Sequence, residues 1–550
     1  MIGVAVRPNE RDIVTEFFEL FKTPWEFCRA GEQYDVVLST SDSNRADTPR
    51  LLLLFEGEPF DAQHGIKTKS QSGGVIVSDE GKRLPIYGNL TTFPGSPNSI
   101  LKEEATQEPA SFLSRSGDST TLRVGYNLFS EVRFLLTVGQ PAINAGIPTL
   151  EEHIGWLRDL ITLAGIPLVE IPPVPDGYKF VGCLTHDIDH PALRNHRCDR
   201  TMFGFLYRST IGTLLKVCHG RKPVKSLLKN WGAAWRLPFV HLGMANDFWA
   251  QFDRYLEIED GHGATFFVIP RGNYAGRTTN GPAPTSRACH YDIDQLLPKL
   301  KRIISTGREV GVHGLDAWLD SDEGRKERER VSESIGTAEL GVRMHWLFFN
   351  ENSPIVLDRA GFDYDTTVGY RETIGYRAGT TQAYRPPGVA KLLELPMHVM
   401  DTALFYPAYL NLSEDEAERL VGRLLNDLER IGGALTINWH DRSIAPERLW
   451  DDFYLRLLAE LKSRRAWLPN AALAVAWFRK RRSATMRWSW SGTRAIRVHA
   501  SVETTDALPD LKVRVFKPRA GSLSDPPNKR RAPEFLEKRF EGTTDLEFTI

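Results

Sequence analysis

The chain has 550 residues, and its 69 Lys and Arg against 70 Asp and Glu leave a formal net charge of −1. This length exceeds the roughly 100–200 residues of one domain and predicts two or three domains, while the balanced charge gives no reason to expect nucleic-acid binding by the whole chain. Hydrophobic residues at 41% and charged residues at 25% are values of a folded soluble protein, and they exclude a disordered chain and a bundle of membrane-spanning helices.

Cysteine use and the start of the chain bear on location. The five cysteines form no CxxC pair, which favours reduced thiols. Charged residues from Arg7 to Asp12 interrupt the apolar stretch that a signal peptide needs, and no run approaches the roughly 20 apolar residues of a spanning helix. We therefore expect a cytoplasmic protein.

The first region, residues 1–175, alternates short apolar runs with polar turns and contains a helical stretch near 150–163. We predict an accessory α/β domain without catalytic residues. A Pro-rich connector at 171–177 follows, and the apolar run 178–185 is typical of a buried strand. A second domain is therefore expected to start at about residue 176.

The second region, residues 176–482, repeats strand, loop and helix. Further runs typical of buried strands lie at 263–269, 309–312 and 434–439. Ser413 and Glu416 have the spacing of a capping box, which predicts the start of the helix before the last of these strands. The repeated pattern predicts an α/β fold, with a barrel-like βα domain over 176–482.

The last region, residues 483–550, has apolar residues at strand period and predicts a small β-rich module. The chain shows no internal repeat, phosphate-binding loop or dinucleotide-binding glycine pattern. These absences lower the expectation of a nucleotide-dependent enzyme.

Ionisable residues follow three of the predicted strands. Asp187 and Asp189 come after the first strand, His313 after the strand at 309–312, and His440 after the strand at 434–439. The C-terminal strand ends of a βα barrel form one face, so these side chains are expected to converge. Two carboxylates two residues apart point to one side of an extended chain, so one can bind a metal while the other accepts a proton. The alternative for the pair is a turn that caps a helix.

Five segments resemble, in their order, the motifs of the polysaccharide deacetylase family (carbohydrate esterase family 4): 185–189, 264–267, 311–313, 341–345 and 435–440. The resemblance spans about 178–482. It implies a distorted (β/α) barrel that binds zinc or a similar divalent ion and removes N- or O-acetyl groups from sugars. It also implies roles for single residues: Asp187 as the base, Asp189 and His313 as metal ligands, Arg343 as the group that orients the base, and His440 as the general acid.

One family ligand is missing from this chain. The family usually has a second metal histidine four residues after the first, but Ala317 occupies that position. A divergent bacterial branch has a later Arg-x-His-aromatic motif, which Arg343, His345 and Trp346 match. We therefore propose His345 as the replacement ligand, with Asp316 as the alternative.

Three residues are assigned to substrate binding: Tyr376, Arg377 and Asp316. Arg377 lies in a predicted loop, and its guanidinium suits a carboxylate or phosphate on the substrate. A structural ion pair is the alternative interpretation of Arg377.

A basic insertion occupies residues 200–246. No acidic residue lies between Asp199 and Asp247, and interleaved aromatic and aliphatic residues indicate amphipathic helices. Its basic residues are Arg200, Arg208, Lys216, Arg221, Lys222, Lys225, Lys229 and Arg236. We predict peripheral contact with the inner face of a membrane that carries a lipid-linked glycan. The alternative is a solvated helical hairpin packed on the barrel.

The sequence thus predicts a metal-dependent hydrolase that removes acetyl groups from a polysaccharide or oligosaccharide, with exopolysaccharide among the candidate substrates and Zn²⁺ as the expected ion. Ala317 keeps a second hypothesis open, namely a non-catalytic glycan-binding or scaffold protein of a polysaccharide-assembly system. A glycosidase pair is disfavoured, because carboxylates two residues apart on one strand can hardly flank a glycosidic bond. No nucleic-acid partner is expected.

Overall fold

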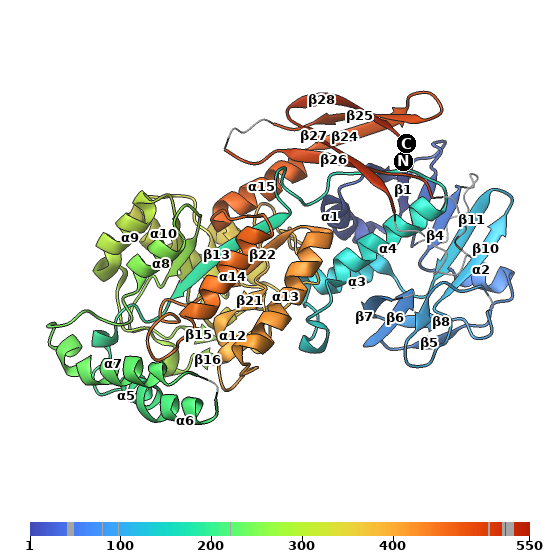
Figure 1. The fold of residues 1–550 in the computed structure, drawn as a ribbon. Coiled ribbons are helices and arrows are strands. Elements are labelled where there is room, and N and C mark those ends of the chain that lie inside the picture. The colour runs from blue at the N-terminus through green and yellow to red at the C-terminus, as the bar shows by residue number, and fades with distance from the viewer. Residues whose placement is uncertain are drawn as a thin grey trace. The chain divides into compact units, whose positions relative to one another are not determined.

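The computed structural model describes residues 1–40, 49–79, 81–96, 98–220, 222–503, 507–519, 523 and 533–550. The chain divides into two units (Figure 1). The first comprises Met1–Gly177, Tyr376–Pro387 and Ala476–Ile550, and the second comprises Tyr178–Gly375 and Gly388–Val475. The division into three domains stays a prediction; the C-terminal strands and a short internal segment are grouped here in the same compact unit as the N-terminal region.

The second unit is built on a nine-stranded sheet in the order β20-β19-β18-β17-β14-β13-β22-β21, with β23 also paired to β13. Its strands are β13 (Phe180–Ile188), β14 (Thr265–Val268), β17 (Glu309–Gly314), β18 (Val342–Met344), β19 (Tyr364–Asp365), β20 (Leu393–Glu394), β21 (Val399–Met400), β22 (Ala434–Asn438) and β23 (Ala466–Trp467). Every strand pair is parallel. The sheet curls into a half-barrel, which confirms the predicted distorted (β/α) barrel.

Helices connect these strands, as the βα pattern predicted (Figure 1). They are α5 (Arg200–Tyr207), α6 (Thr213–Cys218), α7 (Lys225–His241), α8 (Phe252–Ile258), α9 (Leu297–Ser305), α10 (Ser321–Ile335), α11 (Ser353–Ala360), α12 (Asp401–Phe405), α13 (Glu414–Ile431) and α14 (Asp451–Ser463). The capping box at α13 is confirmed, because the Glu416 amide donates to Ser413 Oγ and the Ser413 amide donates to the Glu416 carboxylate. Helix α15 (Ala471–Ser483) runs across the boundary between the units.

Strand β13 is central to the site, and all nine of its residues are buried. A strand covered on both faces reads as a nearly continuous apolar run, which is what residues 180–184 show. The strand continues past the predicted end at residue 185, so that Asp187 is a strand residue and Asp189 follows the strand directly. The carboxylate of Asp187 is therefore placed by backbone that is paired with β14, and Asp189 is the first residue beyond this pairing.

The first unit contains a six-stranded sheet in the order β10-β11-β4-β3-β1-β2. Its strands are β1 (Ile2–Ala5), β2 (Trp25–Phe27), β3 (Val36–Ser39), β4 (Leu51–Leu54), β10 (Ser111–Ser116) and β11 (Ser119–Val124). Its longer helices are α1 (Arg11–Phe21), α3 (Leu128–Thr137) and α4 (Thr149–Leu163), and a short one is α2 (Glu58–Gln63). This is the predicted α/β architecture of the N-terminal region.

Smaller sheets complete the first unit. Two three-stranded sheets have the orders β12-β26-β27 and β24-β25-β28. Their strands are β12 (Leu168–Glu170), β24 (Thr485–Trp490), β25 (Ala495–Ser501), β26 (Leu511–Phe516), β27 (Phe535–Phe540) and β28 (Thr543–Thr549). Short strands β5 (Lys69–Gln71), β6 (Val75–Asp79), β7 (Lys82–Ile86), β8 (Leu90–Thr92) and β9 (Lys102–Glu103) form two further small sheets. No helix in the described part of the chain is long and apolar enough to cross a membrane.

Candidate metal and catalytic site

Residues at the carboxyl ends of four strands of the nine-stranded sheet, β13, β17, β18 and β22, meet at one cavity of about 400 Å³ in the second unit. Its lining includes Asp187 and Asp189 from β13, His313 from β17, His345 after β18 and His440 after β22. Parallel strands deliver their carboxyl ends to the same edge of a sheet, and this is why residues more than 250 positions apart converge here. The predicted convergence at the strand ends is therefore observed.

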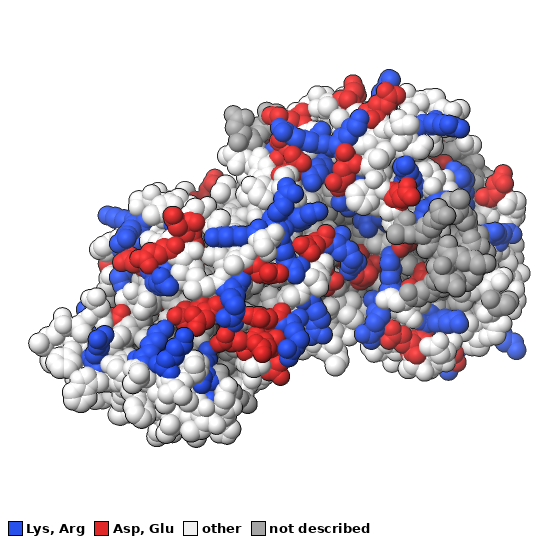
Figure 2. Space-filling model, in the orientation of Figure 1, with Lys and Arg blue, Asp and Glu red and all other residues white. Residues whose placement is uncertain are grey.

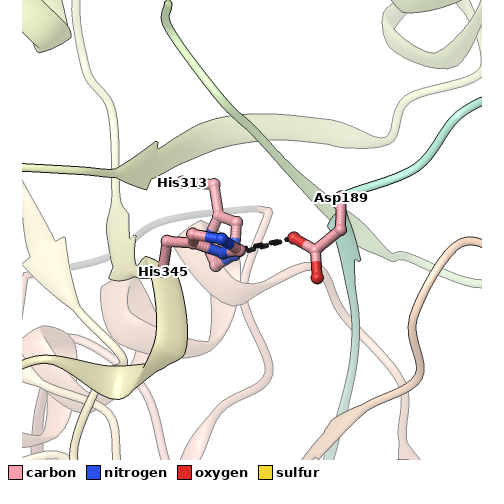
Figure 3. Close-up of side chains that lie close together, drawn as sticks. All are labelled: Asp189, His313 and His345. Atoms are coloured by element: carbon pink, nitrogen blue, oxygen red, sulfur yellow. Dashed lines mark hydrogen bonds and ion pairs between the residues drawn. The ribbon is translucent and has the colours of Figure 1, made fainter. Parts of the chain in front are cut away.

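Asp189, His313 and His345 form a tight cluster in this cavity (Figure 3). Asp189 Oδ1 lies 3.3 Å from His313 Nε2 and 3.3 Å from His345 Nδ1. The two histidine nitrogens lie 3.0 Å from each other. Both histidine side chains are nearly fully buried, so bulk water does not screen the interactions among these three groups.

Second hydrogen bonds define which ring nitrogens carry protons. His313 Nδ1 lies 2.9 Å from the Arg343 carbonyl oxygen, and His345 Nε2 lies 3.0 Å from the Arg287 carbonyl oxygen. A carbonyl only accepts, so these two nitrogens are the donors, and in the neutral rings His313 Nε2 and His345 Nδ1 are left with lone pairs. Asp189 Oδ1 is itself buried without a hydrogen-bond partner among the described residues. Three electron-pair donors thus face one another.

This donor set fits a divalent metal ion. Ligands held at about 2.0–2.2 Å around a tetrahedral zinc lie roughly 3.3–3.5 Å apart, close to the separations of the three atoms. Two imidazoles and one carboxylate suit zinc or another borderline ion better than calcium or magnesium. Carbonyl acceptors behind each histidine fix the ring orientation, as in known metal sites. Three protein ligands leave a further position open for water or substrate.

Asp187 is held as an ionised carboxylate beside this cluster. Arg343 Nη1 donates to its Oδ1 at 3.0 Å, and Asn438 Nδ2 donates to its Oδ2 at 2.7 Å. Burial raises the pKa of Asp187, but the nearby His313 and Arg343 outweigh burial and hold the pKa below its ordinary value. Asp187 Oδ2 lies 3.8 Å from His313 Nε2, so the carboxylate faces the donor cluster.

Loss of the buried Arg343–Asp187 pair is expected to destabilise the fold. Arg343 is fully buried and its Nη1 also donates to Thr185 Oγ1 at 2.8 Å. Arg343→Met leaves a buried carboxylate without its countercharge, which costs about 3–5 kcal/mol of the free energy of unfolding. Urea denaturation followed by circular dichroism measures this loss. The control Arg325→Met breaks an exposed ion pair with Asp322 and should change stability by less than about 1 kcal/mol. Equal stability of the two variants would show that the pair has no such role.

His440 is charged and oriented by a residue that the sequence analysis did not identify. Its Nδ1 lies 2.7 Å from Asp401 Oδ1 at the start of α12, and its Nε2 lies 4.0 Å from Asp189 Oδ2. Burial lowers the pKa of His440, but Asp401 and the two site aspartates reverse this and raise it to about 9. Asp401 follows the short strand β21, so its position after a strand was the available signal.

Three residues assigned to substrate binding are not brought to the cavity. Asp316, also the alternative metal ligand, accepts hydrogen bonds from Tyr274 Oη at 2.6 Å and from the Arg277 amide at 2.7 Å. Tyr376 and Arg377 belong to the first unit, where Tyr376 is fully buried. None of the three is among the residues that line the cavity.

A second group of possible metal ligands consists of His196, Asp199 and His290. His196 Nδ1 lies 2.7 Å from Asp199 Oδ2, and His196 Nε2 lies 3.1 Å from His190 Nδ1. Both ring nitrogens of His196 are therefore engaged in hydrogen bonds. The group with free lone pairs is Asp189, His313 and His345, and the candidate metal site is assigned there.

No protein-family model matches the chain, and no curated protein sequence matches it. Among solved structures, a protein described as a polysaccharide deacetylase from Mycobacterium smegmatis is 20% identical, covering 56% of this chain and 95% of its own, with a TM-score of 0.35. A second protein described as a polysaccharide deacetylase, from Pseudomonas aeruginosa PAO1, is 14% identical over 59% of this chain and 98% of its own, with a TM-score of 0.36. PuuE allantoinase is 14% identical over 58% and 96%, with a TM-score of 0.34.

Proposed function

We propose that this chain is a metal-dependent deacetylase of a polysaccharide or oligosaccharide. The observation that carries the proposal is the cluster of Asp189, His313 and His345, in which three lone pairs meet between an ionised Asp187 and a charged His440. Such a site combines metal ligands, a proton acceptor and a proton donor in one cavity, which are the groups that hydrolysis of an amide or ester requires.

Each residue has a defined part in the proposed reaction. A divalent ion held by Asp189, His313 and His345 would acidify a water and polarise the acetyl carbonyl. Asp187 accepts the proton of the attacking water, and Arg343 and Asn438 hold the carboxylate in position. His440 donates a proton to the departing sugar nitrogen or oxygen, and Asp401 keeps the imidazole charged and oriented. Acetate and the deacetylated sugar are the products.

Metal content and acetate release test the proposal together. We expect purified protein to contain one divalent ion by elemental mass spectrometry and to release acetate from at least one member of a panel of N- and O-acetylated glycans. Chelation should abolish the release, and Zn²⁺ should restore it. A folded chain that stays free of metal after incubation with Zn²⁺ would contradict the proposal. It would favour the non-catalytic glycan-binding or scaffold protein to which Ala317, at the usual position of a ligand histidine, also points.

A further inference from the structure

Six arginines line the cavity, and three of them, Arg208, Arg442 and Arg448, interact with one another electrostatically. Arg208 begins the π-helical segment η4 (Arg208–Gly212), and Arg442 and Arg448 follow β22. The Nε atoms of Arg208 and Arg448 are buried and have no hydrogen-bond partner among the described residues. Arg448 is only 5% exposed. Burying a guanidinium N–H group without a hydrogen-bond acceptor costs free energy, unless a bound ligand supplies the acceptor.

Aromatic rings, rather than carboxylates, hold two of these guanidinium groups in place. The Arg448 group lies 5.4 Å from the Tyr406 ring centre and 5.0 Å from that of Trp450, and the Arg442 group lies 5.1 Å from that of Trp249. Ring faces attract cations but accept no strong hydrogen bonds. Stacking therefore orients these groups and leaves their N–H donors available.

The three positively charged guanidinium groups also repel one another. Burial is the main cause that lowers the pKa of Arg448, to about 9, and Arg442 and Arg208 lower it further. Burial likewise lowers the pKa of Arg208, and Arg442 adds to this effect. Glu447 counteracts both shifts; its Oε1 accepts a hydrogen bond from Trp249 Nε1 at 2.9 Å, and its Oε2 has no hydrogen-bond partner among the described residues. An anion bound among the arginines would relieve this repulsion.

We propose that Arg208, Arg442 and Arg448 form a binding subsite for a phosphate-type anion carried by the glycan substrate. Guanidinium groups donate paired hydrogen bonds to the oxygens of phosphate, and several of them match a doubly charged group better than a single carboxylate. The link to a glycan rests on the proposed deacetylase function, whereas the affinity for phosphate does not. A free sugar phosphate and a phosphate that joins a sugar to a lipid share this chemistry.

Calorimetric titration of the chelator-treated full chain tests the subsite without any contribution from a metal or from catalysis. The probes are inorganic phosphate, pyrophosphate, a hexose 1-phosphate and glucuronate. We expect phosphate compounds to bind and to raise the Tm, and Arg208→Gln and Arg448→Met to weaken this binding by about 10- to 100-fold. Tighter binding of pyrophosphate than of hexose 1-phosphate would favour a diphosphate link to a lipid, and the reverse order would favour a free sugar phosphate.

The exposed Arg325→Gln is the matched control and should leave phosphate affinity unchanged. Arg208 is less buried than Arg448, so Arg208→Gln keeps the test valid if Arg448→Met fails to fold. Equal phosphate affinity in the wild type and Arg208→Gln, or an arginine-dependent preference for glucuronate, would overturn the phosphate subsite. Deacetylation without phosphate binding would overturn the subsite and leave the proposed function standing.

The basic insertion carries a second, independent feature, namely two stripes of exposed apolar residues. On α7 and at its end they are Leu228, Trp231, Trp235, Phe239 and Leu242, and over α5, η4 and α6 they are Phe203, Tyr207, Ile211 and Leu214. The spacing of three or four residues places each stripe along one side of its helix. Leu228 is 77% exposed and Trp235 is 79% exposed. Other residues of the same helices, such as Phe205, Ala233 and Leu237, pack into a core cluster with Trp249.

The charged side chains that the structure describes within the insertion are all Lys or Arg, and Lys229 Nζ lies 3.2 Å from Asp451 Oδ2 of α14. Lys225, Lys229 and Arg236 are exposed on α7 beside the apolar stripe. Figure 2 shows the region of α5, α6 and α7 as largely uncharged atoms with Lys and Arg between them. Arg221, also assigned to the basic insertion, lies outside the described residues. An exposed apolar band with basic flanks complements an anionic lipid surface.

We propose that α5, η4, α6 and α7 dock on an anionic bilayer. Aromatic and aliphatic side chains enter the interface while the lysines and arginines meet lipid phosphates. Arg200, Thr201 and Arg208 of the same insertion line the cavity, so docking would present the cavity next to the membrane surface.

Co-sedimentation with phosphatidylcholine vesicles, with and without phosphatidylglycerol, tests the docking. We expect binding that requires phosphatidylglycerol and that falls by at least about tenfold in the double variant Leu228→Ser/Trp235→Ser. Trp490→Ser, at an exposed tryptophan of β24, is the matched control and should bind as the wild type does. Light scattering measures the oligomeric state and so tests whether a second copy of the chain covers this surface instead. A wild type that binds no vesicles but is a dimer, with a monomeric double variant, would overturn docking and assign the surface to a second copy of the chain.

Discussion

Replacement of His345 by alanine is expected to lower the affinity for Zn²⁺ by at least about 100-fold, as judged by metal content after dialysis and by competition with a chromophoric chelator. The physical reason is the geometry of the cluster: His345 Nδ1 lies 3.3 Å from Asp189 Oδ1 and 3.0 Å from His313 Nε2, with its proton committed to the Arg287 carbonyl. His313→Ala and Asp189→Ala should have effects of similar size, because each removes one of three donors.

The variant Asp316→Asn tests whether His345 or Asp316 is the third metal ligand. Asp316 is buried like His345, but its carboxylate is occupied by Tyr274 and Arg277, so this variant should retain the ion. Circular dichroism and gel filtration establish that each variant is folded. Retention of zinc by His345→Ala together with its loss from Asp316→Asn would reverse the ligand assignment.

Asp187→Asn and His440→Asn are expected to lower kcat for deacetylation by about 10²- to 10⁴-fold while the chain keeps its ion. Asparagine at 187 preserves the shape of the side chain but cannot accept the proton of the attacking water. Asparagine at 440 cannot donate a proton to the leaving group, although it can still reach Asp401. Steady-state acetate release and metal content, measured on the same preparations, separate the loss of chemistry from the loss of metal.

His290→Asn provides a matched control for the catalytic variants. His290 is an exposed histidine of the second group of possible ligands, and its Nδ1 lies 3.0 Å from Asn273 Oδ1. We expect unchanged kcat and unchanged metal content in this variant. Near-normal turnover in Asp187→Asn would show that another group accepts the proton and would contradict the assigned roles.

The sequence predicted the site best where ionisable residues directly follow runs typical of buried strands. Strand-like runs followed by Asp187, His313 and His440 were sufficient to predict that these side chains meet, because the topology of parallel strands determines where strand ends lie. The βα repeat predicted a barrel-like domain, and the family resemblance implied that the barrel is distorted. His345 was proposed as a ligand from a resemblance, and the structure places it within 3.3 Å of Asp189 Oδ1.

Contacts between distant segments were not predictable in this way. Asp401 orients His440, but the two-residue strand before it is too short to be recognised from composition. Arg377 was assigned to the substrate because a guanidinium in a loop suits an anionic group, and Tyr376 lies beside it, yet both residues belong to the first unit. Sequence proximity to a motif does not determine on which unit a loop packs, since that choice depends on tertiary contacts.

The pairing of β12 with β26 has a consequence for biosynthesis. Glu170 in β12 aligns with Arg514 in β26, so the partner strand is translated about 340 residues after the first one. At about 5–20 residues per second, a ribosome needs roughly 20 to 70 seconds to deliver it. The second unit, which ends at Val475, is fully translated before β26, whereas the first unit still lacks its last strands. During this time the edge of β12 that pairs with β26 is unpaired. An unpaired strand edge can associate with other chains, so this edge is a site where a chaperone would protect the nascent chain.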